Sequence, residues 1–218
     1  MINRIQNLIN TAEEAFLQSL EEFFTSIYNE ERLISHGLGH HCRVWENAKE
    51  LLQCVEYKEN TFNQLFIQKL LMACFLHDIG MSIESGIKHG HHSREFCNRF
   101  LKEQNMKAAD YQDLLSAIEN HDNKDYDDPG NNDLLLTILS VADDLDAFGE
   151  TGISRYLEIY QERGVEKFMV GQAIRENARK RFKNFERLYH KYPELIEKHR
   201  KRFLILDTFF KNNHLTTE

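Results

Sequence analysis

Apolar residues recur at three- and four-residue spacing along almost the whole chain, and this periodicity constrains the fold more than any other feature. It predicts helices over about 2–28, 40–55, 62–78, 91–103, 108–121, 132–148, 152–161, 165–190 and 193–211. With 2 prolines and 10 glycines among 218 residues, turns are few. We therefore expect an all-α bundle of about eight to ten helices, and we exclude an all-β or collagen-like chain.

The segments between these helices are short and polar, and we interpret 80–90 and 120–130 as loops because they are rich in Gly, Asp and Asn. We find no internal repeat and no low-complexity linker. We expect one domain over 1–218, with a core over about 36–150 and a basic helical section over about 152–212. The best candidate for a seam between them is 149–152.

The longest unbroken apolar run, 70–76, is far shorter than the roughly 20 residues of a membrane span. The first residues have no apolar signal-peptide core. The four cysteines, at 42, 54, 74 and 97, form no CxxC pair, so they are typical of free thiols in a reducing compartment. We expect a cytoplasmic protein with no membrane association, no disulfide scaffold and no Cys-rich zinc site.

The net charge of −8 is unevenly distributed. Residues 163–202 hold 13 Lys and Arg against 5 Asp and Glu, whereas the rest of the chain holds 14 against 30. The basic section either meets phosphate groups or is a solvated helix face. The acidic total and the lack of a recognition motif argue against DNA binding.

Eight of the 11 histidines fall between residues 36 and 121, and His77–Asp78 is the central pair. It directly follows the most apolar segment of the chain. Polar groups at the end of a buried helix are costly unless they are paired or bind a metal, and imidazole and carboxylate are both good ligands of divalent ions.

Similar groups recur at other predicted helix ends. They are His40–His41, His89 with His91 and His92, His121–Asp122, and the acids Asp143, Asp144 and Asp146 in the last apolar helix before residue 150. Asp143 and Asp146 share a helix face, whereas Asp144 points elsewhere. Any one of these would be a cap or a core residue, but five such places together predict a metal site.

The motifs HHCRV, FLHDIG and VADDLDA, in this order, resemble those of the HD-domain superfamily of metal-dependent phosphohydrolases. That superfamily is an all-α bundle, and the resemblance covers about 36–150. It implies His40, His77, Asp78 and Asp143 as metal ligands. His40 matches because it stands three residues before Arg43.

Some members carry two further histidines between the His-Asp pair and the last Asp, and bind two metals; His89 and His121 lie where these are expected. We thus expect one or two divalent ions of the Mn, Fe, Mg, Zn or Ni class per chain, with Asp78 and His121 as catalytic residues. The Gly-Tyr-Pro signature of the cyclic-dinucleotide phosphodiesterase branch does not occur, which argues against that activity.

Three further residues are candidates for substrate binding: His36, Lys88 and Arg155. Cations stabilise charge on phosphoryl oxygens, although each of the three is also a common surface residue. We interpret His41, His91 and His92 as surface or supporting residues, and Asp146 as a residue that orients a ligand or forms a salt bridge.

The sequence thus predicts a phosphohydrolase for a nucleotide or another small phosphorylated metabolite. Two alternatives remain open. One is a diiron oxygenase of the same fold, because the six-ligand set resembles that of such enzymes; the other is a non-catalytic HD-like signalling module. The amphipathic helix at 2–28 packs into the core or forms the face of a homodimer.

Overall fold

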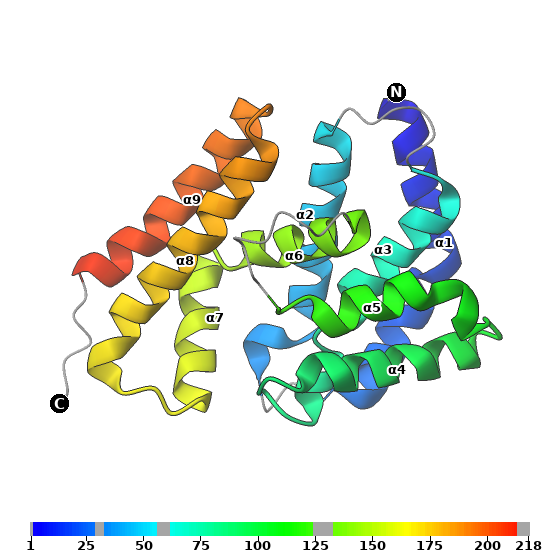
Figure 1. Cartoon of the computed structure of the whole chain (residues 1–218), viewed down its shortest axis with the longest axis horizontal. Helices are drawn as coiled ribbons and strands as arrows, with labels where there is room; N and C mark the ends of the chain where they lie inside the picture. Colours follow the sequence, from blue (N-terminus) through cyan, green and yellow to red (C-terminus); the bar gives the residue numbers. More distant parts are fainter. Residues whose placement is uncertain (1, 29–32, 56–61, 124–132, 213–218) are drawn as a thin grey trace. The chain divides into compact units, whose positions relative to one another are not determined.

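The computed structural model describes residues 2–28, 33–55, 62–123 and 133–212. Within these ranges the chain forms nine α-helices and three short 3-10 helices and has no strand (Figure 1). This confirms the prediction of an all-α fold.

The chain divides into two compact units, a first unit over Met1–Ala142 and a second unit over Asp143–Glu218. Helix α6 (Leu134–Asp146) contains the boundary, which lies seven residues before the expected seam at 149–152. That the whole chain is one domain stays a prediction.

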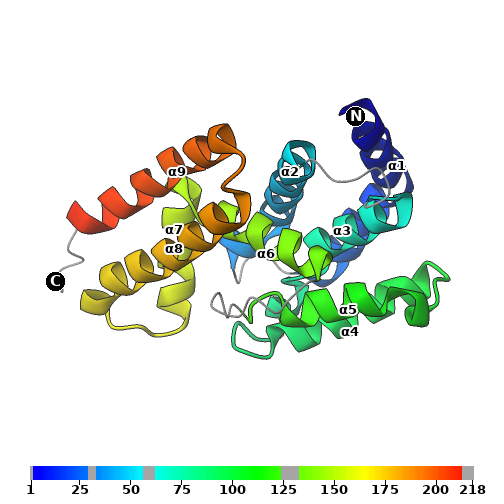
Figure 2. The same cartoon turned by 45° about the horizontal axis from the view of Figure 1, so that its top comes forward.

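The first unit is built from five further α-helices. They are α1 (Ile2–Ile27), α2 (Leu38–Cys54), α3 (Gln64–Leu76), α4 (His89–Glu103) and α5 (Gln112–Asn120), with the 3-10 helices η1 (Ile34–His36), η2 (Ile79–Ser82) and η3 (Ala108–Tyr111). Helix α3 packs against α1, α2 and α5, and α4 lies beside α5 (Figures 1 and 2).

Helix α3 is the central element of this unit. Asn63 caps it by accepting a hydrogen bond from the backbone N–H of Phe66 at 2.8 Å. The stretch Gln64–Ser82 is long and apolar enough by composition to cross a membrane, but 78% of it is buried inside the protein. Such burial is typical of the core helix of a soluble protein, which is apolar on all sides because it contacts neighbours on all sides.

The expected loop at 80–90 is partly wrong. Residues Ile79–Ser82 form η2, and α4 begins at His89, two residues before the expected start. The backbone N–H of Gly80 donates to Ser93 Oγ at 2.9 Å, so a contact with α4 shapes this segment. The helix expected at 108–121 is divided into η3 and α5. Residues 124–130 of the expected polar loop lie outside the described residues.

The second unit begins with the last residues of α6. It continues with α7 (Gly149–Glu162), α8 (Lys167–Tyr189) and α9 (Pro193–Asn212). Helices α8 and α9 lie side by side (Figures 1 and 2). The rings of Phe182 and Phe203 stack on each other with their centres 4.7 Å apart. Pro193 stands at the first position of α9, where its missing N–H costs nothing.

Candidate metal centre

His77 and Asp78 lie where the central helix α3 ends. His77 still has helical backbone angles, whereas Asp78 leaves the helix with φ −107° and ψ 4°. Both are buried. The following η2 touches α4 closely, because a Cβ atom placed on Gly80 would lie 2.2 Å from the carbonyl oxygen of His89. The glycine therefore permits the contact that brings the start of α4 to Asp78.

Four imidazoles surround the Asp78 carboxylate, two at each oxygen. Oδ2 lies 3.5 Å from Nε2 of both His40 and His77. Oδ1 lies 3.0 Å from Nε2 of His121 and 3.3 Å from Nε2 of His89. Within each pair the two Nε2 atoms are 3.3 Å apart. These five residues come from α2, the end of α3, α4 and the end of α5, and each residue is at most 5% exposed.

Three of these rings are oriented by the same backbone contact. Nδ1 of His77, His89 and His121 bonds to the carbonyl oxygen three residues earlier, at 3.1, 2.7 and 2.7 Å. A carbonyl oxygen only accepts, so Nδ1 carries a proton in each ring, and in a neutral ring Nε2 then faces Asp78 with its lone pair. Histidines that bind metals are commonly held by a hydrogen bond from the other ring nitrogen in this way.

This arrangement leaves acceptors facing one another. Around Oδ1 of Asp78, Nε2 of His89 and Nε2 of His121 are both lone-pair atoms when their rings are neutral, and the carboxylate oxygen accepts as well. Three buried acceptors this close repel one another unless a cation or protons lie between them. A divalent ion fits this donor set, and the ligand atoms of Asp78, His89 and His121 all lie within 4.8 Å of one another.

The pKa values reflect the same need for positive charge. Burial by itself would raise the pKa of Asp78, but the charge of His77 and hydrogen bonds from His121, His40 and His89 outweigh it and hold the pKa well below its usual range. Burial would lower the pKa of His89, yet the hydrogen bond and charge of Asp78 raise it to about 9. In the absence of metal, the buried carboxylate therefore stays ionised and draws a proton onto His89.

Neighbouring histidines support this cluster. His36 is buried with its ring 5.5 Å from that of His40. His41, expected at the surface or in a supporting role, is fully buried, and its Nδ1 bonds to the same Cys74 carbonyl as Nδ1 of His77. Burial lowers the pKa of His41, and the charges of His40 and His77 lower it further. The surface interpretation of His41 was wrong because its ring packs against Phe24 at 4.4 Å.

Other candidates near α4 lie outside the cluster. His91 is exposed and pairs with Glu119 and Glu95, at 3.2 and 3.6 Å. Lys88 is exposed at the N-terminal end of α4, one residue before His89. Within α4, therefore, it is His89 and not His91 that reaches Asp78.

The second unit opens with three buried acids that are paired with arginines. Arg155 of α7 contacts both Asp143, at 3.4 Å, and Asp146, at 3.1 Å. Arg181 of α8 contacts Asp144 at 2.9 Å and Asp143 at 3.8 Å. Asp143 and Asp146 thus share a partner, as their spacing predicts. Arg181 was not among the predicted site residues, because nothing in its local sequence pattern distinguishes it from the other cations of α8.

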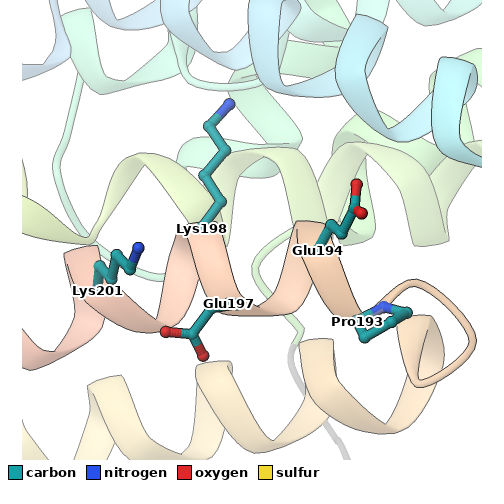
Figure 3. A pocket seen from close by; sticks show the side chains of 5 residues that line it. All are labelled: Pro193, Glu194, Glu197, Lys198 and Lys201. Atoms are coloured by element: carbon teal, nitrogen blue, oxygen red, sulfur yellow. The ribbon is translucent and has the colours of Figure 1, made fainter.

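A surface pocket on α9 contains none of the predicted site residues (Figure 3). It is lined by Pro193, Glu194, Glu197, Lys198 and Lys201. Two acids and two bases at the surface of one helix offer no concentrated charge for a phosphate or a metal. The candidate functional site is the buried cluster around Asp78.

Comparison with known proteins adds one finding. A family model described as HD domain matches residues 37–147, just over half of the chain. The match runs from the residue before α2 to the residue after α6, and it includes all six predicted metal ligands. No curated protein and no solved structure matches the chain.

Proposed function

The chain belongs to the HD domain family, and from this membership we propose that it is a metal-dependent phosphohydrolase. HD domains are typically metal-dependent hydrolases. We propose a nucleotide or another small phosphorylated metabolite as its substrate and water as the second reactant. The hydroxyl of water adds to phosphorus, the ester P–O bond breaks, and the leaving oxygen takes up a proton.

The observation that carries this proposal is the position of the Asp78 carboxylate between two imidazole pairs. Each oxygen faces its own pair, His40 and His77 on one side and His89 and His121 on the other. A carboxylate has lone pairs on both oxygens, so it can serve two ions at once. The geometry supports two metal positions that share one carboxylate.

The donor atoms favour certain metals. Imidazole nitrogens suit Zn, Fe, Ni and similar ions, whereas Mg prefers oxygen ligands and water. Two imidazoles and one carboxylate oxygen on each side therefore favour Fe, Ni or Zn over Mg.

We propose Asp143 as the fourth ligand of the ion held by His40, His77 and Asp78. The residue before Asp143 contacts α2, which carries His40. The side-chain amide of Asn47 donates a hydrogen bond to the carbonyl oxygen of Ala142 at 2.9 Å.

His40, His77, Asp78, Asp143, His89 and His121 would hold the metal, which when bound would supply a water with its pKa lowered from ~15.7 toward neutrality and would polarise a phosphoryl oxygen. The chain's own residues hold and orient the reacting groups. If an ion were bound only by His40 and His77, Nε2 of His121, which lies 3.0 Å from Asp78, would be the group that moves a proton to the leaving oxygen. Where both sides are loaded, Asp78 and His121 act as ligands.

For substrate binding we propose three further residues. Lys88, exposed one residue before His89, offers a cation to a phosphate oxygen. His36, whose ring lies beside that of His40, offers a hydrogen bond. Arg155 holds Asp143 and Asp146, and a phosphate group would compete with these carboxylates for its guanidinium.

The test is metal analysis of the purified protein, together with a phosphatase screen over nucleotides and sugar phosphates. Asp78→Asn should lose both ions and all turnover, because it weakens the ligand that the two sides share. The matched control is Asp122→Asn, an exposed acid next to His121, which should keep both. Full metal content and normal turnover in Asp78→Asn would refute the site.

The same preparation tests the oxidative alternative. Two imidazole pairs on one carboxylate also suit two iron ions, and an oxygenase would consume dioxygen when its substrate is present. Iron content with oxygen uptake and no phosphate release would assign the chain to that chemistry. Metal-free protein with neither activity would favour a signalling module.

A further inference from the structure

The exposed face of α8 carries a line of four cations in the second unit. Lys180, Lys183, Arg187 and Lys191 follow one another at spacings of three, four and four residues, which places them on one side of the helix and its C-terminal extension. All four are exposed. We call them the α8 stripe. At 1.5 Å per residue they span roughly 16 Å.

The stripe lies opposite the apolar face of the same helix. Ala178, Phe182, Phe185 and Tyr189 are buried, and the rings of Phe182 and Phe185 contact Phe203 and His199 of α9. The α8 stripe is therefore directed away from the α8–α9 contact. Because its apolar face is already covered, this helix cannot lie in a membrane surface as an amphipathic anchor does.

Charge pairing distinguishes the stripe from the cations around it. The neighbouring arginines have acidic partners: Arg175 and Arg179 with Asp207, Arg181 with Asp144, and Arg200 with Glu186. Within the described ranges, no member of the stripe forms an ion pair. Arg187 donates only to the amide oxygen of Asn184, at 2.8 Å. The α8 stripe is thus an unneutralised row of charge on a chain whose net charge is −8.

We propose that the α8 stripe binds the phosphodiester backbone of single-stranded nucleic acid. The acidic total of the chain and the lack of a recognition motif argue against sequence-specific DNA binding, whereas the local excess of 13 Lys and Arg over 5 Asp and Glu in residues 163–202 supports contact with phosphates alone. A strand carries one negative charge per nucleotide at regular intervals, which matches a row of regularly spaced cations. The stripe consists of Lys and Arg alone, and Phe182, Phe185 and Tyr189 of the same helix are buried. We therefore expect it to contact phosphates rather than base edges. Binding is therefore independent of base sequence.

This binding does not use the metal centre. The stripe consists of residues of the second unit alone, and none of them is among the predicted ligands. The proposal consequently stands apart from the phosphohydrolase assignment, and binding should be equal with and without a metal chelator.

The experiment measures fluorescence anisotropy of a labelled oligothymidine of about 20 nucleotides, long enough for several protein site sizes. For single strands the slope of log K against log salt is about −0.7 per phosphate contacted, so four contacts predict a slope near −3. Between about 50 and 200 mM salt, affinity should therefore fall about 50-fold.

The test variant is Lys183→Gln with Arg187→Gln, which removes the middle of the stripe. The slope of log K against log salt should become shallower, from near −3 to about −1.4, because two of the four phosphate contacts are lost. Binding at low salt should weaken at least tenfold. The matched control is Lys102→Gln with Lys107→Gln, which removes the same charge from exposed positions in the first unit. It should bind as the unmodified chain does.

Several outcomes would overturn the proposal. One is an equal loss of affinity in both double variants. Another is no binding of the oligonucleotide at about 50 mM salt, where contacts of this kind are strong. A third is tighter binding to polyglutamate or to phosphatidylserine vesicles than to the oligonucleotide. Circular dichroism of each variant confirms that it is folded, which is expected because all four substituted positions are exposed.

Discussion

Gly90→Ala should separate the metal centre into its two halves. A Cβ atom on Gly90 would lie 2.4 Å from the carbonyl oxygen of Glu119, and an ordinary contact begins near 3.4 Å. Helices α4 and α5 would have to move apart by about 1 Å, as overpacked contacts force backbone shifts. His89 is on α4 and His121 directly follows α5, so their Nε2 atoms, now 3.3 Å apart, separate by a similar amount.

Metal–ligand distances in protein sites lie within about 0.2 Å of their usual values, so a shift of about 1 Å between two ligands disturbs the coordination. We therefore expect Gly90→Ala to lose the ion held by His89 and His121, and to keep the ion held by His40 and His77, which lie on other helices. Overpacking of this kind costs about 1–3 kcal/mol of folding free energy.

Metal content by elemental analysis after reconstitution, with thermal unfolding of the metal-free protein, measures both effects. The matched control is Gly171→Ala, a glycine within α8 where the nearest atom to a new Cβ is 3.5 Å away. It should keep both ions and unfold at the same or a higher temperature, because alanine stabilises a helix interior relative to glycine. If Gly90→Ala retained two ions with unchanged affinity, the close approach of α4 and α5 would not be what positions the second metal.

Three other predictions test individual side chains. His121→Ala should lower the metal content from two ions per chain toward one. The control His91→Ala removes an exposed imidazole of the same region and should leave the content at two. A single ion in the unmodified protein would contradict the two-metal proposal. Asp143→Asn should weaken metal binding more than Asp144→Asn, and isothermal titration showing equal losses would refute the assignment of Asp143. Burial by itself would raise the pKa of Asp207, but hydrogen bonds and charges from Arg175 and Arg179 hold it below its usual range. The ionised form therefore stabilises the fold at pH values above the usual pKa of an aspartate, and this stability is lost as the pH falls through the lowered pKa of the folded state. Denaturant unfolding from about pH 6 to pH 2 should show a shallower acid loss in Asp207→Asn.

The amino-acid pattern by itself determined the helical architecture and the order of the ligands. Helices that bury one face keep a three-to-four spacing of apolar residues, so the position of α3 could be predicted to within two residues at each end. The pairing of His77 with Asp78 after this helix was visible for the same reason, since a polar pair next to a buried apolar run requires a partner. The helix positions and the polar pair both depend on residues that are close in the sequence. Such contacts produce a regular spacing that can be read from the sequence alone.

Only the tertiary structure decided how these groups meet. The division of Asp78 between two imidazole pairs depends on close approaches at Gly80 and Gly90, where backbone touches backbone. The burial of His41 and the pairing of Arg181 with Asp144 likewise depend on which helix lies next to which. Such contacts join residues that are tens of positions apart, so no spacing in the sequence records them, and they exist only once the helices have packed.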